Sequence, residues 1–275
     1  MGRVLRNPFG GVVLALLAVL AAGTGGARAG EASGGEAAPA GVGAVEPAEP
    51  DWPLSFSFDA TYASKYVWRG IVVTEDPVFE PTAAVGIGDL TLSVWANLDT
   101  TDVNNFRNQA NEIDYTLDYS FSWECLHLSV GAIHYAFPQA HVFDTTEAYL
   151  AIGLDVPTSP TLTVYQDLDE HDGQYITLGF SHTFEDVWKP CEDVGVSVEA
   201  WTQFAWGSRK HNGFYYGSGS GWADATVGVS VPISIGDHLT ITPYANYMWI
   251  LDDSITGALG RDDAFWAGLS ATISF

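Results

Sequence analysis

The chain has 275 residues, with 34 Asp and Glu against 10 Lys and Arg, and its formal net charge is −24 at pH 7. This balance excludes a nucleic-acid-binding protein, because contact with phosphates needs a basic face, and it excludes docking on anionic lipid through a polybasic patch. Two cysteines are too few for a disulfide-rich scaffold or for a zinc site built from cysteines alone.

The first 29 residues have the order of segments found in a secretory signal peptide. Arg3 and Arg6 precede an uncharged, mostly apolar run at 11–22, and a small-residue cleavage pattern follows at 27–29. A membrane-spanning helix needs about 20 apolar residues, so we expect a cleaved signal peptide over 1–29. Residues 30–50 are rich in Ala, Gly, Glu and Pro and contain no aromatic residue, which predicts a disordered linker.

From residue 51 onward, apolar and polar residues alternate with a period of two, which is typical of strands with one apolar and one polar face. The alternation is clearest at 54–62, 90–98, 113–123, 194–201 and 265–275. Weaker or more uniformly apolar runs lie at 79–87, 126–136, 147–156, 161–168, 174–184, 222–233 and 239–250. We therefore expect about twelve strands of roughly ten residues each, and no helix after residue 50.

The connections between these strands alternate between short and long. Gly88-Asp89, Glu124-Cys125, 157–160 and 236–238 are short, and 185–193 is expected as the one longer member of the short set. The other loops are mostly longer, at 66–78, 99–111, 137–146, 169–173, 207–221 and 251–263. Outer-membrane barrels have short periplasmic turns and longer external loops. Residues 51–275 are thus predicted to be all-β, forming a transmembrane antiparallel meander β-barrel of about 12 strands in the bacterial outer membrane.

A soluble β-sandwich is the alternative fold, because it also has many short alternating strands. Sandwich strands average about 5–6 residues, whereas strands of about ten residues match a tilted membrane span. Closure also removes the sheet edges, and these strands lack the Lys residues that protect an edge. Aromatic residues gather near strand ends, as interfacial girdles require; they are Tyr62, Trp123, Phe184, Trp188, Trp206, Trp249, Phe265 and Phe275.

Residues 62–71, Tyr-Ala-Ser-Lys-Tyr-Val-Trp-Arg-Gly-Ile, resemble the opening strand and first loop of the TorF-type porin family, also called the Gcw_chp family. In that family a Ser-x-Tyr-x-x-Arg-Gly core follows the first strand, and Ser64, Tyr66, Arg69 and Gly70 match it here. The resemblance implies an outer-membrane barrel with a porin-like role over 51–275.

Three further positions, Thr74, Asp76 and Pro77, stand where the family often has a Thr, an acid and Pro. The sequence departs from the family directly after Arg-Gly, where Ile-Val-Val-Thr at 71–74 replaces the usual Ile-Ser-Gln-Thr. The last strand, which ends in Phe275, is similar to the signal that the outer-membrane assembly machinery reads. That machinery, membrane lipid and small solutes are the expected partners; nucleic acid is not.

If the apolar faces contact lipid, the alternate residues face the lumen. A cation at the midplane of the lipid face costs about 2–4 kcal/mol, and a carboxylate somewhat less, so acids deep in a strand are assigned to the lumen. The expected lumen and constriction residues are Asp59, Asp114, Asp118, Glu147, Asp155, Glu199, Asp224 and Arg69. No Lys or Arg lies in the clear strands, which favours passive diffusion of small polar or cationic solutes through an acidic lumen.

The alternative function is a non-conducting barrel whose lumen is filled by side chains and folded-in loops, and whose external loops act as a receptor or adhesin. The loop at 207–221, with Phe214-Tyr215-Tyr216 among Gly and Ser, is the best candidate surface. Arg69, just past the first strand, either pairs with a lumen carboxylate or has a local structural role with Gly70. A glycine there would supply a backbone conformation that other residues resist.

No residue pattern predicts catalysis, a metal or a cofactor. Ser181 and His182 are adjacent in a strand and point to opposite faces, and no G-x-S-x-G elbow occurs. Acids crowd the loop at 167–172 and flank the loop at 252–263, a density that can hold Ca²⁺ or Mg²⁺, but they lack EF-hand spacing and are expected to be solvated. Cys125 and Cys191 lie in different turns, so we expect two free thiols.

Overall fold

The computed structural model describes residues 54–139 and 142–275. The expected signal peptide at 1–29 and linker at 30–50 lie outside the described residues. Two short helices are present, α2 (Arg209–Tyr215) and α3 (Asp253–Leu259), although no helix was expected after residue 50. Among the described residues, neither helix is long or apolar enough to cross a membrane.

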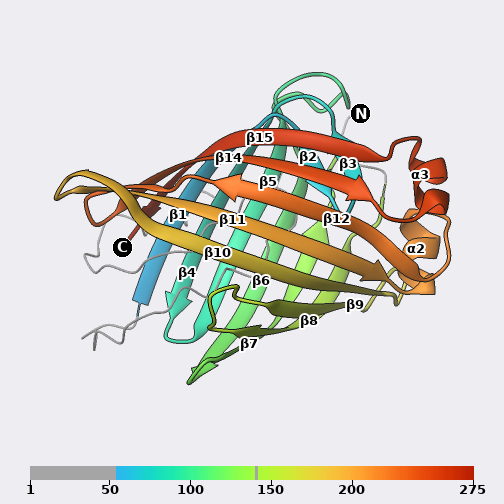
Figure 1. Cartoon of the computed structure of the whole chain (residues 1–275). Coiled ribbons are helices and arrows are strands. Elements are labelled where there is room, and N and C mark those ends of the chain that lie inside the picture. Colours follow the sequence, from blue (N-terminus) through green and yellow to red (C-terminus); the bar gives the residue numbers. More distant parts are fainter. Residues whose placement is uncertain (1–53, 140–141) are drawn as a thin grey trace, which may run out of the picture.

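Among the described residues, thirteen antiparallel strands fill twelve positions in one closed wall (Figure 1). The strands are β1 (Leu54–Ala63), β4 (Val78–Ile87), β5 (Leu90–Asp99), β6 (Ala110–Trp123), β7 (Leu126–Ala136), β8 (Thr145–Leu154), β9 (Thr161–Asp167), β10 (Gln174–Cys191), β11 (Val194–Gly207), β12 (Gly221–Ser230), β13 (Ile233–Ile235), β14 (Leu239–Ile250) and β15 (Asp263–Ser274). The short β13 continues the line of β12 beyond Pro232, because both strands pair with β11 and β14.

The wall has no open edge, because its first and last strands pair with each other. β1 pairs with β4 on one side and with β15 on the other, and β10 pairs with both β9 and β11. Beyond the end of β15, the backbone of Phe275 exchanges two hydrogen bonds with Phe56, at 2.9 and 3.0 Å. The predicted antiparallel meander barrel is therefore confirmed, and every barrel strand has two neighbours, which satisfies the backbone groups that lipid cannot.

The alternation of side chains also follows the prediction. In β15, Phe265 and Leu269 are exposed on the outer face, whereas Trp266 and Ser270 are buried inside. The same inside-outside order holds in β1, where Tyr62 faces out and Thr61 faces in. An apolar outer face around a closed wall suits lipid, and the polar inner face is the lumen.

Short turns lie at one end of the barrel, with the last residue Phe275, and we call this the turn end. The opposite end carries α2, α3 and most of the long connections, and we call it the loop end (Figure 1). The predicted loop at 185–193 is wrong in one respect, because β10 runs on to Cys191 and β11 begins at Val194. Register shifts accompany this extension, which projects past its neighbours at the turn end in Figure 1.

The largest departure from the expected loops follows β1. Residues 66–78, expected as an external loop, form a small hairpin of β2 (Tyr66–Trp68) and β3 (Ile71–Thr74). Tyr66, Arg69 and Thr74 are buried, so the hairpin folds into the lumen rather than over its rim. We call residues 64–77 the inserted hairpin.

Cys125 and Cys191 are both exposed and free, which confirms the expectation of two unpaired thiols. Cys125 follows the end of β6, and Cys191 ends β10. Because four strands separate these positions around the wall, the two thiols have no opportunity to form a bond within one chain.

Candidate functional site

The inserted hairpin crosses the lumen and is fixed to several parts of the wall. On the β5–β6 side, the Thr74 hydroxyl donates to Asp99 at 2.9 Å, and Asn111 donates to the same oxygen at 3.0 Å. Two strands farther around the wall, Arg69 reaches Glu147 of β8. The loop end of the lumen is therefore bridged by a segment held at both of its sides.

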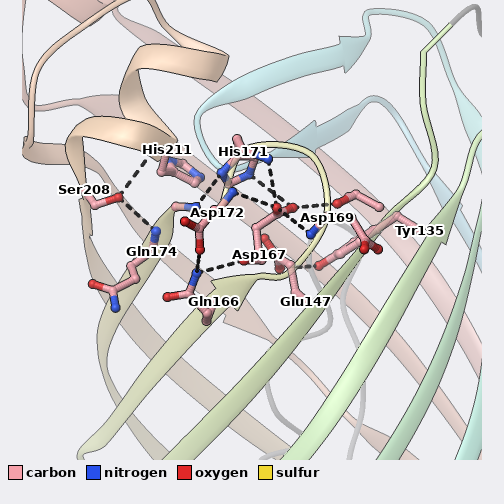
Figure 2. A network of polar contacts seen from close by, with 12 residues as sticks. Tyr135, Glu147, Gln166, Asp167, Asp169, His171, Asp172, Gln174, Ser208 and His211 are labelled. Atoms are coloured by element: carbon pink, nitrogen blue, oxygen red, sulfur yellow. Dashed lines mark hydrogen bonds and ion pairs between the residues drawn. The ribbon is translucent and has the colours of Figure 1, made fainter.

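Arg69 and Glu147 form a buried bidentate ion pair. The two guanidinium nitrogens donate to the two carboxylate oxygens at 2.8 and 2.6 Å, and both side chains are almost fully shielded from solvent. The Tyr135 hydroxyl also donates to Glu147, at 3.0 Å (Figure 2). A guanidinium and a carboxylate match in this planar geometry, which is one of the stronger hydrogen-bonded pairs in proteins.

Aromatic rings enclose the same guanidinium. Its central carbon lies 4.7 Å from the ring centre of Trp68, 4.9 Å from that of Tyr165 and 4.4 Å from that of Tyr175. Such contacts stabilise a desolvated cation through the negative ring faces. Arg69 thus pairs with a lumen carboxylate, as one of the two sequence interpretations expected, and it also anchors the hairpin.

Gly70 supplies the conformation that the hairpin turn needs. Its φ is +81°, in the left-handed region, and a Cβ at this position would lie 2.8 Å from Cδ1 of Ile250 and 3.4 Å from Cβ of Asp224. Only glycine meets both requirements without strain. The close approach places the hairpin tip against β12 and β14, a third side of the wall.

Helix α2 closes over the hairpin from the loop end. Ser208 caps its N-terminus by accepting from the His211 backbone, and the Tyr216 hydroxyl just after the helix donates to the Arg69 carbonyl oxygen at 2.6 Å. Tyr215 packs edge-on against Trp68 at 4.9 Å between ring centres. The loop expected to offer an aromatic recognition surface therefore turns Tyr216 inward, and of its three aromatic residues only Phe214 is mainly exposed.

His211 of α2 completes the surroundings of Arg69. Its Nε2 lies 3.4 Å from a guanidinium nitrogen, so Nε2 is the acceptor and Nδ1 donates to Asn212 at 3.1 Å. Burial, with the Arg69 charge beside the ring, lowers the pKa of His211 to about 3. The imidazole is therefore neutral at physiological pH, and Arg69 is the cation of this cluster.

Glu147, Asp167 and His171 bring their ligand atoms within 4.8 Å of one another (Figure 2). The hydrogen bonds do not fit a metal site, because His171 Nδ1 accepts from the Gly173 backbone at 3.0 Å, which places the ring proton on Nε2. A metal-binding histidine points its unprotonated nitrogen at the metal and donates from the other nitrogen. Here the unprotonated nitrogen is already bonded to Gly173. Nε2 instead faces Asp167 at 3.4 Å.

Asp167 is the organising residue of the connection between β9 and β10. One of its oxygens accepts from the backbones of Asp169, His171 and Asp172, at 3.2, 2.9 and 3.0 Å (Figure 2). The other oxygen accepts from Thr145 at 2.5 Å. The expectation of a solvated acidic loop is therefore wrong for Asp167, which is fully buried.

A second group of acids lines the wall from β1 to β6, and we call it the acidic wall: Asp59, Glu80, Glu112, Asp114 and Asp118. Asp59 accepts from Thr61 at 2.6 Å, from Thr272 at 2.8 Å and from Ser270. Asp118 accepts from Tyr149 at 2.5 Å and from Ser129. These partners are neutral hydroxyls, so they orient the carboxylates without cancelling their charge.

The structure places most of the predicted lumen residues inside the barrel. Asp59, Asp114, Asp118, Glu147, Glu199 and Asp224 lie on inward positions of their strands. Glu199 accepts from Ser230 at 3.3 Å, and Asp224 accepts from Tyr175 at 2.8 Å. Asp155 is the exception: it lies one residue beyond β8, is exposed, and donates its backbone N–H to the Cys125 carbonyl. It belongs to a turn because the strand ends before it.

Four interior carboxylates were not among the predicted residues, namely Glu80, Asp99, Glu112 and Asp167. The sequence alternation could have identified Glu112, because it lies two residues before Asp114 and therefore points to the same inner face. Glu80 is likewise in phase with Thr82, but Phe79 and Pro81 on either side make that run look uniformly apolar. Asp99 and Asp167 end their strands and were assigned to loops.

Comparison with solved structures finds outer-membrane barrels. The NanC porin has a TM-score of 0.45 at 12% identity, covering 80% of this chain and 98% of its own. An outer membrane channel from Pseudomonas putida F1 has a TM-score of 0.45 at 11% identity, covering 84% of this chain and all of its own. No protein-family model and no curated protein matches the chain. The fold assignment rests on the strand pairing, and membership of the TorF-type family stays a prediction.

Proposed function

We propose that this chain is an outer-membrane porin that lets small polar or cationic solutes diffuse through its acidic lumen, past a constriction formed by the inserted hairpin. The proposal rests above all on the charges inside the barrel. Among the described residues, ten carboxylates face the interior: Asp59, Glu80, Asp99, Glu112, Asp114, Asp118, Glu147, Asp167, Glu199 and Asp224. One cation, Arg69, faces them there, and it is already paired with Glu147.

An interior with this excess of negative charge favours cations. A cleft lined by charges of one sign and walled by low-dielectric protein concentrates counter-ions, and rings of carboxylates select cations in pores. The acidic wall runs along β6 through Asp118, Asp114 and Glu112, at steps of two or four residues. Since each strand residue advances about 3.3 Å, a solute moving along the bore passes these carboxylates in succession.

The same interpretation gives a role to the family-like motif. Ser64, Tyr66, Arg69 and Gly70 lie in the inserted hairpin, where Arg69 is anchored to Glu147 and Gly70 lies against β12 and β14. We propose that the chain belongs to the TorF-type family and that its family-like residues form this constriction rather than an external loop. Insertion by the outer-membrane assembly machinery, after export by the signal peptide, belongs to the same proposal.

Ion selectivity tests the proposal. In a planar bilayer with a KCl gradient, the purified barrel should give reversal potentials that indicate cation preference, and the preference should weaken as salt rises, because the screening length is about 8 Å at physiological ionic strength. Asp114→Asn with Asp118→Asn should reduce the preference without reversing it, because Asp59, Glu80 and Glu199 remain.

Asp89→Asn with Asp237→Asn is the matched control, because it removes the same charge from two exposed turn residues. The control should keep the selectivity of the unmodified protein. Anion preference in the unmodified barrel, or equal effects of the two double variants, would contradict the proposal.

A further inference from the structure

Glu80 has the least compensated charge among the described residues of the acidic wall. It lies on β4 with 1% of its surface exposed, and neither carboxylate oxygen has a hydrogen-bond partner. An ionised carboxylate in such surroundings costs several kcal/mol unless a counter-charge is supplied. The Glu80 carboxylate therefore either holds a proton or pairs with a cation that comes from outside the chain.

The neighbours of Glu80 add negative charge. Glu112 on β6 and Asp59 on β1 both repel a charge on Glu80, and Glu112 accepts a hydrogen bond from Tyr66 of the inserted hairpin. Arg69 is bound to Glu147 on β8. The electrostatic potential at Glu80 therefore favours a positive charge beside the carboxylate, supplied by a proton or by an external cation.

Aromatic rings lie beside these carboxylates. The rings of Tyr66 and Trp95 are 5.4 Å apart between centres. Trp95 pairs across the strands with Thr82, the next inward residue after Glu80, and on its other side with Asp114. Carboxylates next to aromatic faces match an organic cation, whose charge pairs with the acids and whose polarised C–H groups lie on the rings.

The group does not match a divalent metal ion as well. A metal requires several ligand atoms that converge on one point, and in the described part of the chain only Glu147, Asp167 and His171 bring three such atoms within 4.8 Å. The carboxylates near Glu80 do not form such a group of three among the described residues. An extended cation with two charged ends spans separated carboxylates, whereas a single ion does not.

The group also lies where solvent can deliver a ligand. Asp59, Thr82, Trp95 and Asp114 are half-buried, whereas Glu80 and Tyr66 are fully buried. The group therefore combines fully buried and partly exposed residues, and Tyr66 of the inserted hairpin forms one of its sides.

We propose that Glu80 and Glu112, with the rings of Tyr66 and Trp95, form a binding site for an organic cation of the alkyl-diamine class. The inference rests on the proposed function, since it names the solute class for which the passage is built. One ammonium group pairs with Glu80 and the other with Glu112, and the alkyl chain lies against the two rings.

Equilibrium binding to the detergent-refolded barrel tests this site without requiring conduction. Putrescine is titrated while heat of binding is measured by calorimetry, and 1,4-butanediol, which has the same length and no charge, serves as the ligand control. The barrel should bind putrescine saturably and should not bind the diol. Glu80→Gln should weaken putrescine binding at least tenfold, whereas Glu124→Gln, in an exposed turn, should leave it unchanged.

Trp95→Leu gives a second variant if Glu80→Gln does not fold, and it should weaken binding severalfold. Absence of putrescine binding by the folded barrel, or equal binding by the Glu80 variant, would overturn the inference and would mean that Glu80 holds a proton. A barrel that conducts cations selectively but does not bind putrescine would contradict this binding site and support the proposed function. A barrel that binds putrescine but passes no current would support the binding site and contradict the proposed function.

Discussion

At the scale of single residues, the pair of Arg69 and Glu147 decides how the loop end of the lumen is organised. A buried ion pair contributes little net stability compared with apolar residues of the same shape, but removing one partner leaves an uncompensated charge. Here the pair also sets position, because Arg69 carries the hairpin tip and Glu147 belongs to the wall. The sequence predicted both residues as lumen residues. It did not predict that they pair, because 78 positions separate them in the chain.

Replacing one partner of this pair should be costly. Glu147→Gln removes the charge and leaves Arg69 buried, and we expect a loss of about 3–5 kcal/mol in the free energy of unfolding. Urea unfolding of the refolded barrel, followed by tryptophan fluorescence, measures this loss. Glu170→Gln, an exposed residue in a neighbouring loop, is the control and should change stability by less than about 0.5 kcal/mol.

The double variant Arg69→Met with Glu147→Met separates charge from packing. It should recover much of the stability that Glu147→Gln loses, because no unpaired charge remains. A single variant as stable as the unmodified barrel would contradict the assignment of Glu147 as the partner of Arg69.

At the scale of elements, the strands were predictable and the hairpin was not. Each strand separates lipid from a polar interior, so its period of two is imposed along most of its length, as β1 and β15 illustrate. The segment after β1 has no such constraint, and its sequence does not distinguish a loop that covers the rim from one that enters the lumen. Helices α2 and α3 have seven residues each, too few to show a helical period.

The end of the last strand leads to a prediction about assembly in the outer membrane. The backbone of Phe275 exchanges two hydrogen bonds with Phe56 at the seam between β15 and β1, and its ring stacks on His238 at 4.9 Å. Deleting Phe275 should deplete the protein severalfold from the outer membrane, because two hydrogen bonds at the end of the seam and the terminal aromatic ring are lost. Membrane fractionation measures the depletion.

Phe275→Tyr keeps the backbone and the ring, and should accumulate at the level of the unmodified protein. Normal outer-membrane levels of the deletion variant would show that barrel closure and assembly do not depend on this residue.

At the scale of the whole molecule, a closed wall with an apolar outside, an acidic inside and one inserted segment gives a coherent account of the sequence. The strong excess of acids, visible in the composition, is explained in part by the lumen, where carboxylates face a polar interior rather than lipid. Composition and alternation were enough to predict the barrel and most of its inward acids. They were not enough to predict that a segment next to β1 fills the loop end, because this depends on contacts between residues far apart in the chain.

Single-channel recording in a planar bilayer tests the central claim most directly, with the unmodified barrel beside a variant in which residues 65–75 are replaced by a short Gly-Ser turn. Both proteins are first shown to be folded by their heat-modifiable migration in gels. The unmodified barrel should give small, cation-selective conductance steps, and the shortened variant should give steps severalfold larger, because the hairpin no longer bridges the lumen. Silence from both folded proteins, or equal conductance in the two, would contradict a passage through this lumen that the hairpin constricts.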